Sequence, residues 1–361
     1  MKAKKLIIRS VAALAACLII VIALGGADIV FAPRYTGPVS DHFDGEQFHN
    51  PQAADQATDD ARRGRALKWM TNRKIGPWRE YQDHPPGQRP PSRVGKGLLR
   101  VTFVNHSTVL IQMDDLNILT DPIWASRASP VSWAGPPRVR PPGIRIEDLP
   151  PIDWVIISHN HYDHLNIPTL KLLNHKFRPR FLTGLGNGEL LKRHAIQDVT
   201  EIDWWAATSL SDEVRVTGVP AQHFSARGPF DRNRTLWLGF VIQGPAGNVY
   251  FAADTGLGPH FDKIRDAFGP LRLTMLPIGA FKPRWFMKRM HLSPEEAVQT
   301  HLLLKAGTSM GVHFGTFKGL ADDGQDAPIN ELNEAREKLG VPAERFWALD
   351  FGEGRDVPPI S

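Results

Sequence analysis

Four possible metal ligands lie within six residues of one another, at His159, His161, Asp163 and His164. They directly follow the apolar residues 154–157, which predict a buried strand. His159 and His161 are two residues apart, so their side chains face the same way wherever the chain is extended. A loop fixed to a buried strand can aim imidazoles and a carboxylate into one small volume, as a binuclear metal site requires. The alternative interpretation is a solvated polar loop or an N-cap cluster.

Three further possible ligands each stand at the end of an apolar segment. His223 and Asp254 follow the predicted strands 214–219 and 248–253, and His313 ends another predicted strand. Side chains at strand ends lie on the rim of a sheet, where several can converge without disturbing the core. Taken singly, the two histidines could be hydrogen-bonded core residues and Asp254 a turn former. Together with the first four, they make seven possible ligands.

This set of ligands resembles the metallo-β-lactamase superfamily, and narrower motifs resemble one family within it, the N-acylphosphatidylethanolamine-hydrolysing phospholipases D. The resemblance covers about residues 64–353. Besides the ligand loop, it rests on VTFVNHSTVL at residues 101–110, LTDP at 119–122, SRASP at 126–130, MHLSPEEA at 290–297 and HFGTF at 313–317. Family members often have Gly-His-Ala-Thr at residues 105–108 and Trp in place of Phe314. Neither departure removes a ligand.

The resemblance implies two zinc ions per chain. The implied ligands are His159, His161 and His223 for one ion, Asp163, His164 and His313 for the other, and Asp254 as a bridge between them. A carboxylate suits the bridge because it offers one oxygen to each ion, and zinc ions about 3.5–4 Å apart can hold a hydroxide between them. Cys17 is the only cysteine, so thiolate ligands are excluded. Sites made of His and Asp also accept iron or manganese.

The implied reaction is hydrolysis of N-acylphosphatidylethanolamine or a related glycerophospholipid. Zinc lowers the pKa of bound water to about 7, so a bridging hydroxide would attack phosphorus and leave N-acylethanolamine and phosphatidic acid. Besides Asp163 and Asp254, the resemblance assigns His291 to catalysis, to orient the substrate or protonate the leaving oxygen. The alternative is that His291 is a helix N-terminal residue, since residues 293–296 form a capping box with Pro at N1.

Residues 281–290 interleave aromatic and basic side chains just before His291. Such a pattern is typical of a surface that touches lipid headgroups. We therefore expect Arg284, Trp285 and Phe286 to contact the membrane or the phospholipid substrate. The alternative is a loop whose aromatic side chains pack inward.

The N-terminus predicts a membrane anchor. Residues 10–27 are uncharged and mostly apolar, and a helix of 18 residues is about 27 Å long, close to the roughly 30 Å of a bilayer core. Basic residues precede it, so we expect residues 1–9 in the cytoplasm and the catalytic domain in the periplasm of a bacterium, anchored by a single pass in the inner membrane. The alternative is a signal peptide that is cleaved after export.

The net charge of the chain is +5, and residues 1–9 contribute four of these charges, so the remainder is nearly neutral. This balance argues against a nucleic-acid partner. The sequence gives no indication of an oligomeric state.

The chain divides into the anchor, a connector and a hydrolase domain. Residues 28–98 are rich in Pro, Gly and Asp, which predicts a poorly packed connector with a possible short helix at 66–70. Residues 99–361 alternate strands and helices, which predicts an α/β fold of two packed sheets with helices outside. The predicted strands are 100–104, 108–113, 117–120, 153–158, 214–219, 236–243, 248–253, 273–278, 309–313 and 345–350. The predicted helices are 188–195, 259–267, 294–306 and 328–339, with Gly307 and Gly340 as C-caps. The family resemblance implies the αββα sandwich.

Two other functions stay open at this point. The same metal pair could hydrolyse a different ester, such as a lactone or another phosphodiester, because one fold hosts many reactions. The chain could also be a membrane-tethered zinc-binding protein without catalysis.

Overall fold

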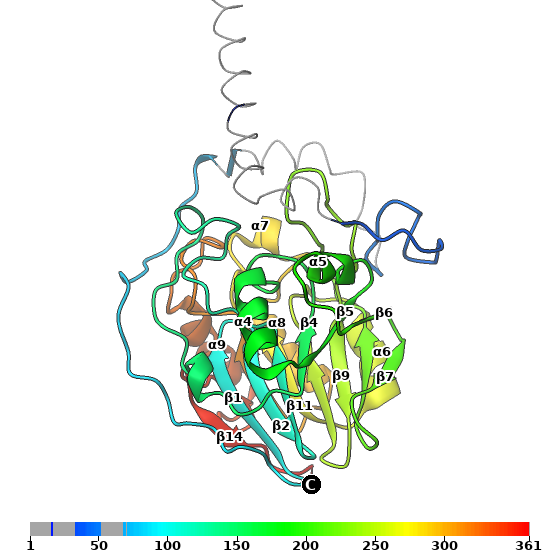
Figure 1. The fold of residues 1–361 in the computed structure, drawn as a ribbon. Coiled ribbons are helices and arrows are strands. Elements are labelled where there is room, and N and C mark those ends of the chain that lie inside the picture. Colours follow the sequence, from blue (N-terminus) through cyan, green and yellow to red (C-terminus); the bar gives the residue numbers. More distant parts are fainter. Residues whose placement is uncertain (1–15, 17–32, 52–67, 70, 361) are drawn as a thin grey trace, which may run out of the picture.

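The computed structural model describes residue 16 and residues 33–51, 68–69 and 71–360. Within these ranges the chain forms two seven-stranded mixed sheets that pack face to face, with helices on the outer faces (Figure 1). This αββα sandwich confirms the predicted fold. The predicted membrane segment lies outside the described residues except for Ala16. Among the described residues no helix is long and apolar enough to cross a membrane.

The two sheets have mirrored strand orders. The first runs β14 (Gly354–Asp356), β1 (Leu99–Asn105), β2 (Thr108–Met113), β3 (Leu116–Thr120), β4 (Trp154–Ile157), β5 (Arg180–Gly184) and β6 (Val199–Ile202). The second runs β13 (Phe346–Trp347), β12 (Thr308–Val312), β11 (Leu271–Pro277), β10 (Asn248–Phe251), β9 (Gly239–Gln243), β8 (Arg215–Val219) and β7 (Ala207–Ser209). Strands β3 to β6 are parallel to one another, and so are β10 to β13.

The helices cover the outer faces of the sheets. They are the 3-10 helix η3 (Ile146–Asp148), α4 (Ile167–Phe177), α5 (Gly188–Arg193), α6 (His260–Phe268), α7 (Arg284–Met287), α8 (Pro294–Leu303) and α9 (Ala327–Leu339). Side chains of α4 and α5 pack on the first sheet, and those of α6, α8 and α9 belong to the main core with the second sheet.

Strand β4, which leads into the ligand loop, is held from both faces. Ile156 points into the core between the sheets, whereas Val155 and Ile157 belong to the separate cluster under α4 and α5. Successive side chains of a strand point to opposite faces, so a strand inside a parallel region is apolar throughout. The loop after β4 therefore starts from a rigid base.

All ten predicted strands are found, with boundaries shifted by one to four residues. The predicted C-cap at Gly340 is confirmed, since Gly340 ends α9 with a left-handed φ of 68°. The C-cap predicted at Gly307 is wrong, because α8 already ends at Leu303 and Lys305 takes the left-handed conformation with φ of 50°. Strands β5, β6, β7 and β14 and helices α4 and α7 were not predicted.

The expectation of a poorly packed connector is wrong for residues 33–51. Phe43 and Phe48 are fully buried in the main core, with their ring centroids 4.6 Å apart. The Asn50 amide donates to the backbone carbonyl of His223 at 2.8 Å and so reaches the ligand region. Burying two aromatic rings stabilises this segment against the domain despite its polar composition.

Candidate metal centre

The seven predicted ligands converge from four loops. His159, His161, Asp163 and His164 follow β4 of the first sheet, and His223, Asp254 and His313 follow β8, β10 and β12 of the second. Six of the seven are buried, and His161 is partly exposed. The sequence-based expectation that strand ends would bring these side chains to one rim of the sandwich agrees with this geometry.

The ligand atoms form two groups of four. One group is His159, His161, His223 and Asp254, and the other is His106, Asp163, His164 and His313, each with ligand atoms within 4.8 Å of one another. The Oδ2 atom of Asp254 lies 3.2 Å from Nε2 of both His164 and His313 and 3.7 Å from Nε2 of His223. Asp254 therefore lies between the two groups.

These spacings fit a metal. With bonds of about 2.0–2.2 Å, two ligand atoms of a tetrahedral zinc lie about 3.3–3.6 Å apart. Asp163 Oδ2 is 3.4 Å from Nε2 of His313 and 3.6 Å from Nε2 of His164. Within the described part of the chain, Nε2 of His164 and His313 and Oδ1 of Asp254 are buried and make no hydrogen bond. A cation is the partner that such atoms lack.

Burial and charge prepare the donors. Burial, with neighbouring histidines, lowers the pKa of His159 well below its usual value, and burial lowers the pKa of His161 and His223 to about 3. These imidazoles are neutral at neutral pH, as metal ligands must be. Burial opposes ionisation of Asp254, but His164 and His313 outweigh it and hold its pKa well below the usual value.

The negative charge of the site attracts cations to His164. Burial disfavours the charged imidazole, yet Asp254, Asp163 and Asp121 together raise the pKa of His164 well above its usual value. Without a metal, a proton therefore occupies the place where a divalent cation would bind more strongly.

A second layer of hydrogen bonds orients the imidazoles. His164 Nδ1 bonds to Asp121 Oδ2 at 2.7 Å, and Asp121 also accepts from the Ser158 backbone N–H at 2.7 Å and hydroxyl at 2.6 Å. His223 Nδ1 donates to the carbonyl of Met290 at 3.0 Å. In both rings this leaves Nε2 directed at the centre, the usual arrangement for metal-bound histidine.

His106 joins the two sheets beneath the centre, a role that the sequence did not reveal. Its Nε2 bonds to Asp163 Oδ2 at 3.0 Å, and its carbonyl accepts from the backbone N–H of His313 at 2.8 Å. His106 is 1% exposed and stacks near the His313 ring with centroids 4.0 Å apart. The only sequence signal was its place in the motif at residues 101–110.

Backbone strain gathers at the same place. His106, Asp121, Ala253 and His313 all have positive φ, between 34° and 62°, although none is glycine. Each such conformation costs roughly 1–3 kcal/mol and persists where the surrounding structure imposes it, commonly at functional sites.

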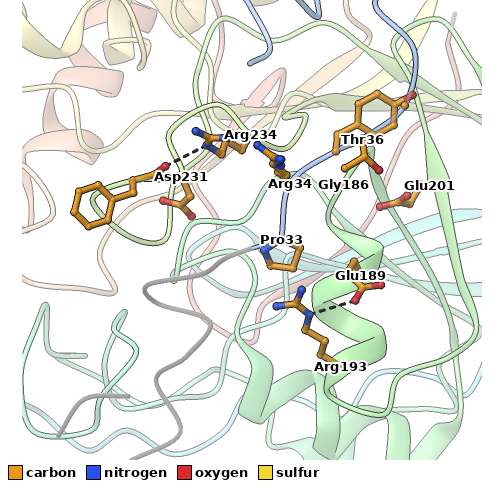
Figure 2. A pocket seen from close by; sticks show the side chains of 12 residues that line it. Pro33, Arg34, Thr36, Gly186, Glu189, Arg193, Glu201, Asp231 and Arg234 are labelled. Carbon is orange, nitrogen blue, oxygen red and sulfur yellow. Dashed lines mark hydrogen bonds and ion pairs between the residues drawn. The ribbon is translucent and has the colours of Figure 1, made fainter. Parts of the chain in front are cut away.

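The centre opens into a cavity of about 630 Å³. Its polar wall includes His161, Asp163, His223, Asp254 and His313, and its apolar wall includes Trp69, Phe286, Met287, Met290 and Leu320. A larger cavity of about 770 Å³ contains none of the seven ligands (Figure 2). Its acidic groups already have partners: Glu189 accepts from Arg193 at 3.2 Å, and Asp231 accepts two backbone N–H groups. The smaller cavity is the candidate site.

Comparison with known proteins agrees with this geometry. The beta-lactamase superfamily domain matches residues 116–314. The chain is 38% identical over 268 residues to N-acyl-phosphatidylethanolamine-hydrolyzing phospholipase D 1 of Caenorhabditis elegans, covering 71% of this chain and 75% of that protein. The chain therefore belongs to the phospholipase D-like family of this name within the metallo-β-lactamase superfamily. It is a metal-dependent hydrolase.

Other relatives are matched over shorter parts. An uncharacterised protein of Mycobacterium tuberculosis is 42% identical over 244 residues, which are 66% of this chain and 64% of that protein. The mitochondrial N-acyl-phosphatidylethanolamine-hydrolyzing phospholipase D of Saccharomyces cerevisiae is 30% identical over 60% of this chain and 47% of its own length. A metallo hydrolase structure from Ignicoccus hospitalis covers 72% of this chain and 99% of its own with a TM-score of 0.54 at 20% identity, which shows a shared fold.

His291 lies before α8 and faces the centre. Its ring centroid is 5.1 Å from that of His223 and 5.3 Å from that of His313. The capping box predicted at the start of α8 is confirmed, with Ser293 and Glu296 as its two members. His291 stands outside this helix, so the alternative interpretation of His291 as a helical residue does not describe its position. Burial lowers the pKa of His291 well below its usual value.

The three residues expected to contact lipid have different surroundings. Trp285 is 42% exposed, whereas Phe286 lines the cavity. Arg284 points inward, donating to Glu296 Oε2 at 2.6 Å and to the His291 carbonyl at 3.0 Å. The lipid contact expected of Arg284 does not fit this position, since the guanidinium is occupied in fixing His291 relative to α8.

We predict that Asp121→Asn lowers metal affinity by about 10–100-fold, because His164 loses its orienting carboxylate. Metal titration of the purified protein would measure this. Asp148→Asn is the matched control, since Asp148 is an equally buried carboxylate that pairs with Arg145 at 2.6 Å. Equal losses in both variants would contradict the orienting role.

Proposed function

We propose that the chain is a zinc-dependent phosphodiesterase of phospholipase D type. Its substrate would be N-acylphosphatidylethanolamine or a related glycerophospholipid, and its products N-acylethanolamine and phosphatidic acid. The observation that carries this proposal is Asp254 between two groups of histidines on the wall of a half-apolar cavity. The printed names of the nematode and yeast relatives support the same reaction.

The residues present fit two zinc ions, held as the family resemblance implies. One ion would take His159, His161 and His223, the other Asp163, His164 and His313, and Asp254 would bridge them. Bound zinc supplies a nucleophilic water at neutral pH and neutralises charge on the phosphate oxygens. Iron or manganese would suit the same donors.

The chain's own groups would then position the phosphodiester. Asp121, Ser158 and the Met290 carbonyl keep the imidazoles fixed, so the donors need no rearrangement when substrate enters. His291 faces the same space and carries an N–H that can donate to the leaving oxygen. Its low pKa favours a neutral imidazole that donates a hydrogen bond over a full proton transfer.

The lipid substrate suits an enzyme at a membrane. The proposed inner-membrane anchor at residues 10–27 would hold the domain at the periplasmic face, where Trp285 could reach the headgroup region. Sequence alone supports this location.

The reaction can be tested directly with the full-length protein in detergent. We expect N-acylphosphatidylethanolamine to give both N-acylethanolamine and phosphatidic acid, detected by mass spectrometry, and a chelator to abolish both products. Absence of products from protein with two metals per chain would contradict the proposed substrate. It would favour another ester, such as a lactone.

Asp254→Asn should lower both metal occupancy and turnover, with kcat falling at least about ten-fold, because the bridge loses its charge. Elemental analysis and the same lipid assay measure the two effects. Full activity with two metals still bound would refute the bridging role.

His291→Gln should lower kcat by about 10²-fold on lipid while metal content stays unchanged. The loss should be much smaller on an aryl phosphodiester, because its leaving group needs no hydrogen bond. His301→Gln is the control, since His301 is buried in α8 and bonds to Ser309 away from the cavity. Equal losses of His291→Gln on both substrates would argue against leaving-group assistance.

A further inference from the structure

One wall of the catalytic cavity comes from the connector. Residues 69–79 run along residues 319–326, with backbone hydrogen bonds of 2.9 Å from Gly76 to Asp322 and from Gln325 to Pro77. A Cβ on Gly76 would lie 2.6 Å from the backbone nitrogen of Gly324, so this close approach requires glycine. The two segments therefore pack as one layer.

Side chains reinforce this layer. Arg79 pairs with both carboxylate oxygens of Asp326 at 2.9 and 2.7 Å. The indole N–H of Trp78 donates to the carbonyl of Asp323 at 2.9 Å, and the Asp323 carboxylate accepts from the backbone of Ala280 at 3.2 Å. Since Ala280 lines the cavity, these contacts link the connector to the site.

Trp69 is placed most firmly. Its indole N–H donates to Asp322 Oδ2 at 2.5 Å, while Arg73 donates to the other oxygen of the same carboxylate at 2.9 Å. The Arg73 guanidinium also lies 5.0 Å from the Trp69 ring centroid. The indole is thus held by both its polar edge and its π face.

The Trp69 ring packs against Phe286 of α7, with centroids 4.9 Å apart. Both residues line the cavity that holds the metal ligands, next to Met287, Met290 and Leu320. Methionine adapts its shape easily, which suits a surface that receives flexible chains of different length. The polar half of the same cavity carries His291 and the ligands.

We infer that Trp69 and Phe286 form a chain-binding wall, on which an acyl or alkyl chain of the substrate lies while its phosphate faces the metal ligands. This deepens the proposed function and rests on it for the identity of the phosphate group. Residues 68–79 are then part of the substrate site and determine its preference for chain length.

A homologous series of alkyl phosphates, from butyl to dodecyl and below their micelle concentrations, tests the wall without turnover. Calorimetry with metal-loaded full-length protein in one detergent measures affinity against chain length. Full burial is worth about four-fold in affinity for each added methylene, so a clear slope is expected for the unmodified protein. Partitioning into detergent is the same for every variant and cancels in their ratios.

Trp69→Ala should reduce that slope strongly, so that dodecyl phosphate loses at least ten-fold in affinity while butyl phosphate changes less than about two-fold. Phe286→Ala should act in the same direction from the other side, and Trp69→Phe should restore most of the slope. Trp205→Ala is the control, because it removes a 44% exposed indole that does not line this cavity. It should behave as the unmodified protein.

A flat series, an unchanged slope in Trp69→Ala, or an equal loss at every chain length would overturn the inference. The last result would mean that Trp69 is only structural. Turnover of the lipid with a flat series would keep the proposed reaction and reject the wall. A steep, Trp69-dependent series without lipid turnover would keep the wall and reject the substrate.

Discussion

The burial of ionised carboxylates among imidazoles is the constraint on which the rest of this structure depends. Asp163 and Asp254 are at most 8% exposed, and their pKa values are held well below the usual range. A buried charge is costly unless cations or hydrogen-bond donors compensate it. Protonated His164 does so in part, but Asp254 Oδ1 has no hydrogen-bond partner among the described residues. A divalent metal pair satisfies what the protein leaves unsatisfied.

The same constraint accounts for the second layer. An imidazole that binds a cation through Nε2 needs its Nδ1 side fixed, and Asp121 and the Met290 carbonyl do this for His164 and His223. His106 extends the arrangement across the sandwich, because it bonds to Asp163 beside the first sheet and to the backbone of His313 beside the second. Positive φ angles at His106 and His313 are the local cost of this junction.

Sequence carries the ligands and their strands because both are local signals. An apolar run followed by histidines can be recognised in a window of ten residues, as at β4. The roles of Asp121 and His106 depend on partners 43 and 57 residues away, so no local pattern reveals them. Helix α4 was missed because Leu172, 55% exposed, lies beside the buried Leu173 and obscures the helical period. Strands of three residues such as β7 and β14 are too short to show a period.

The connector shows how composition can mislead. Its Pro and Gly content predicts weak packing, but packing depends on a few aromatic contacts, and Phe43, Phe48 and Trp69 supply them. Reaction and selectivity are then carried by different parts of the chain. The metal ligands stand on strand ends that the two cores hold rigid, whereas part of the cavity wall comes from a segment joined to the domain by hydrogen bonds and ion pairs. Because that segment contributes none of the seven ligands, its side chains can change which molecule enters without changing the donors that act on it.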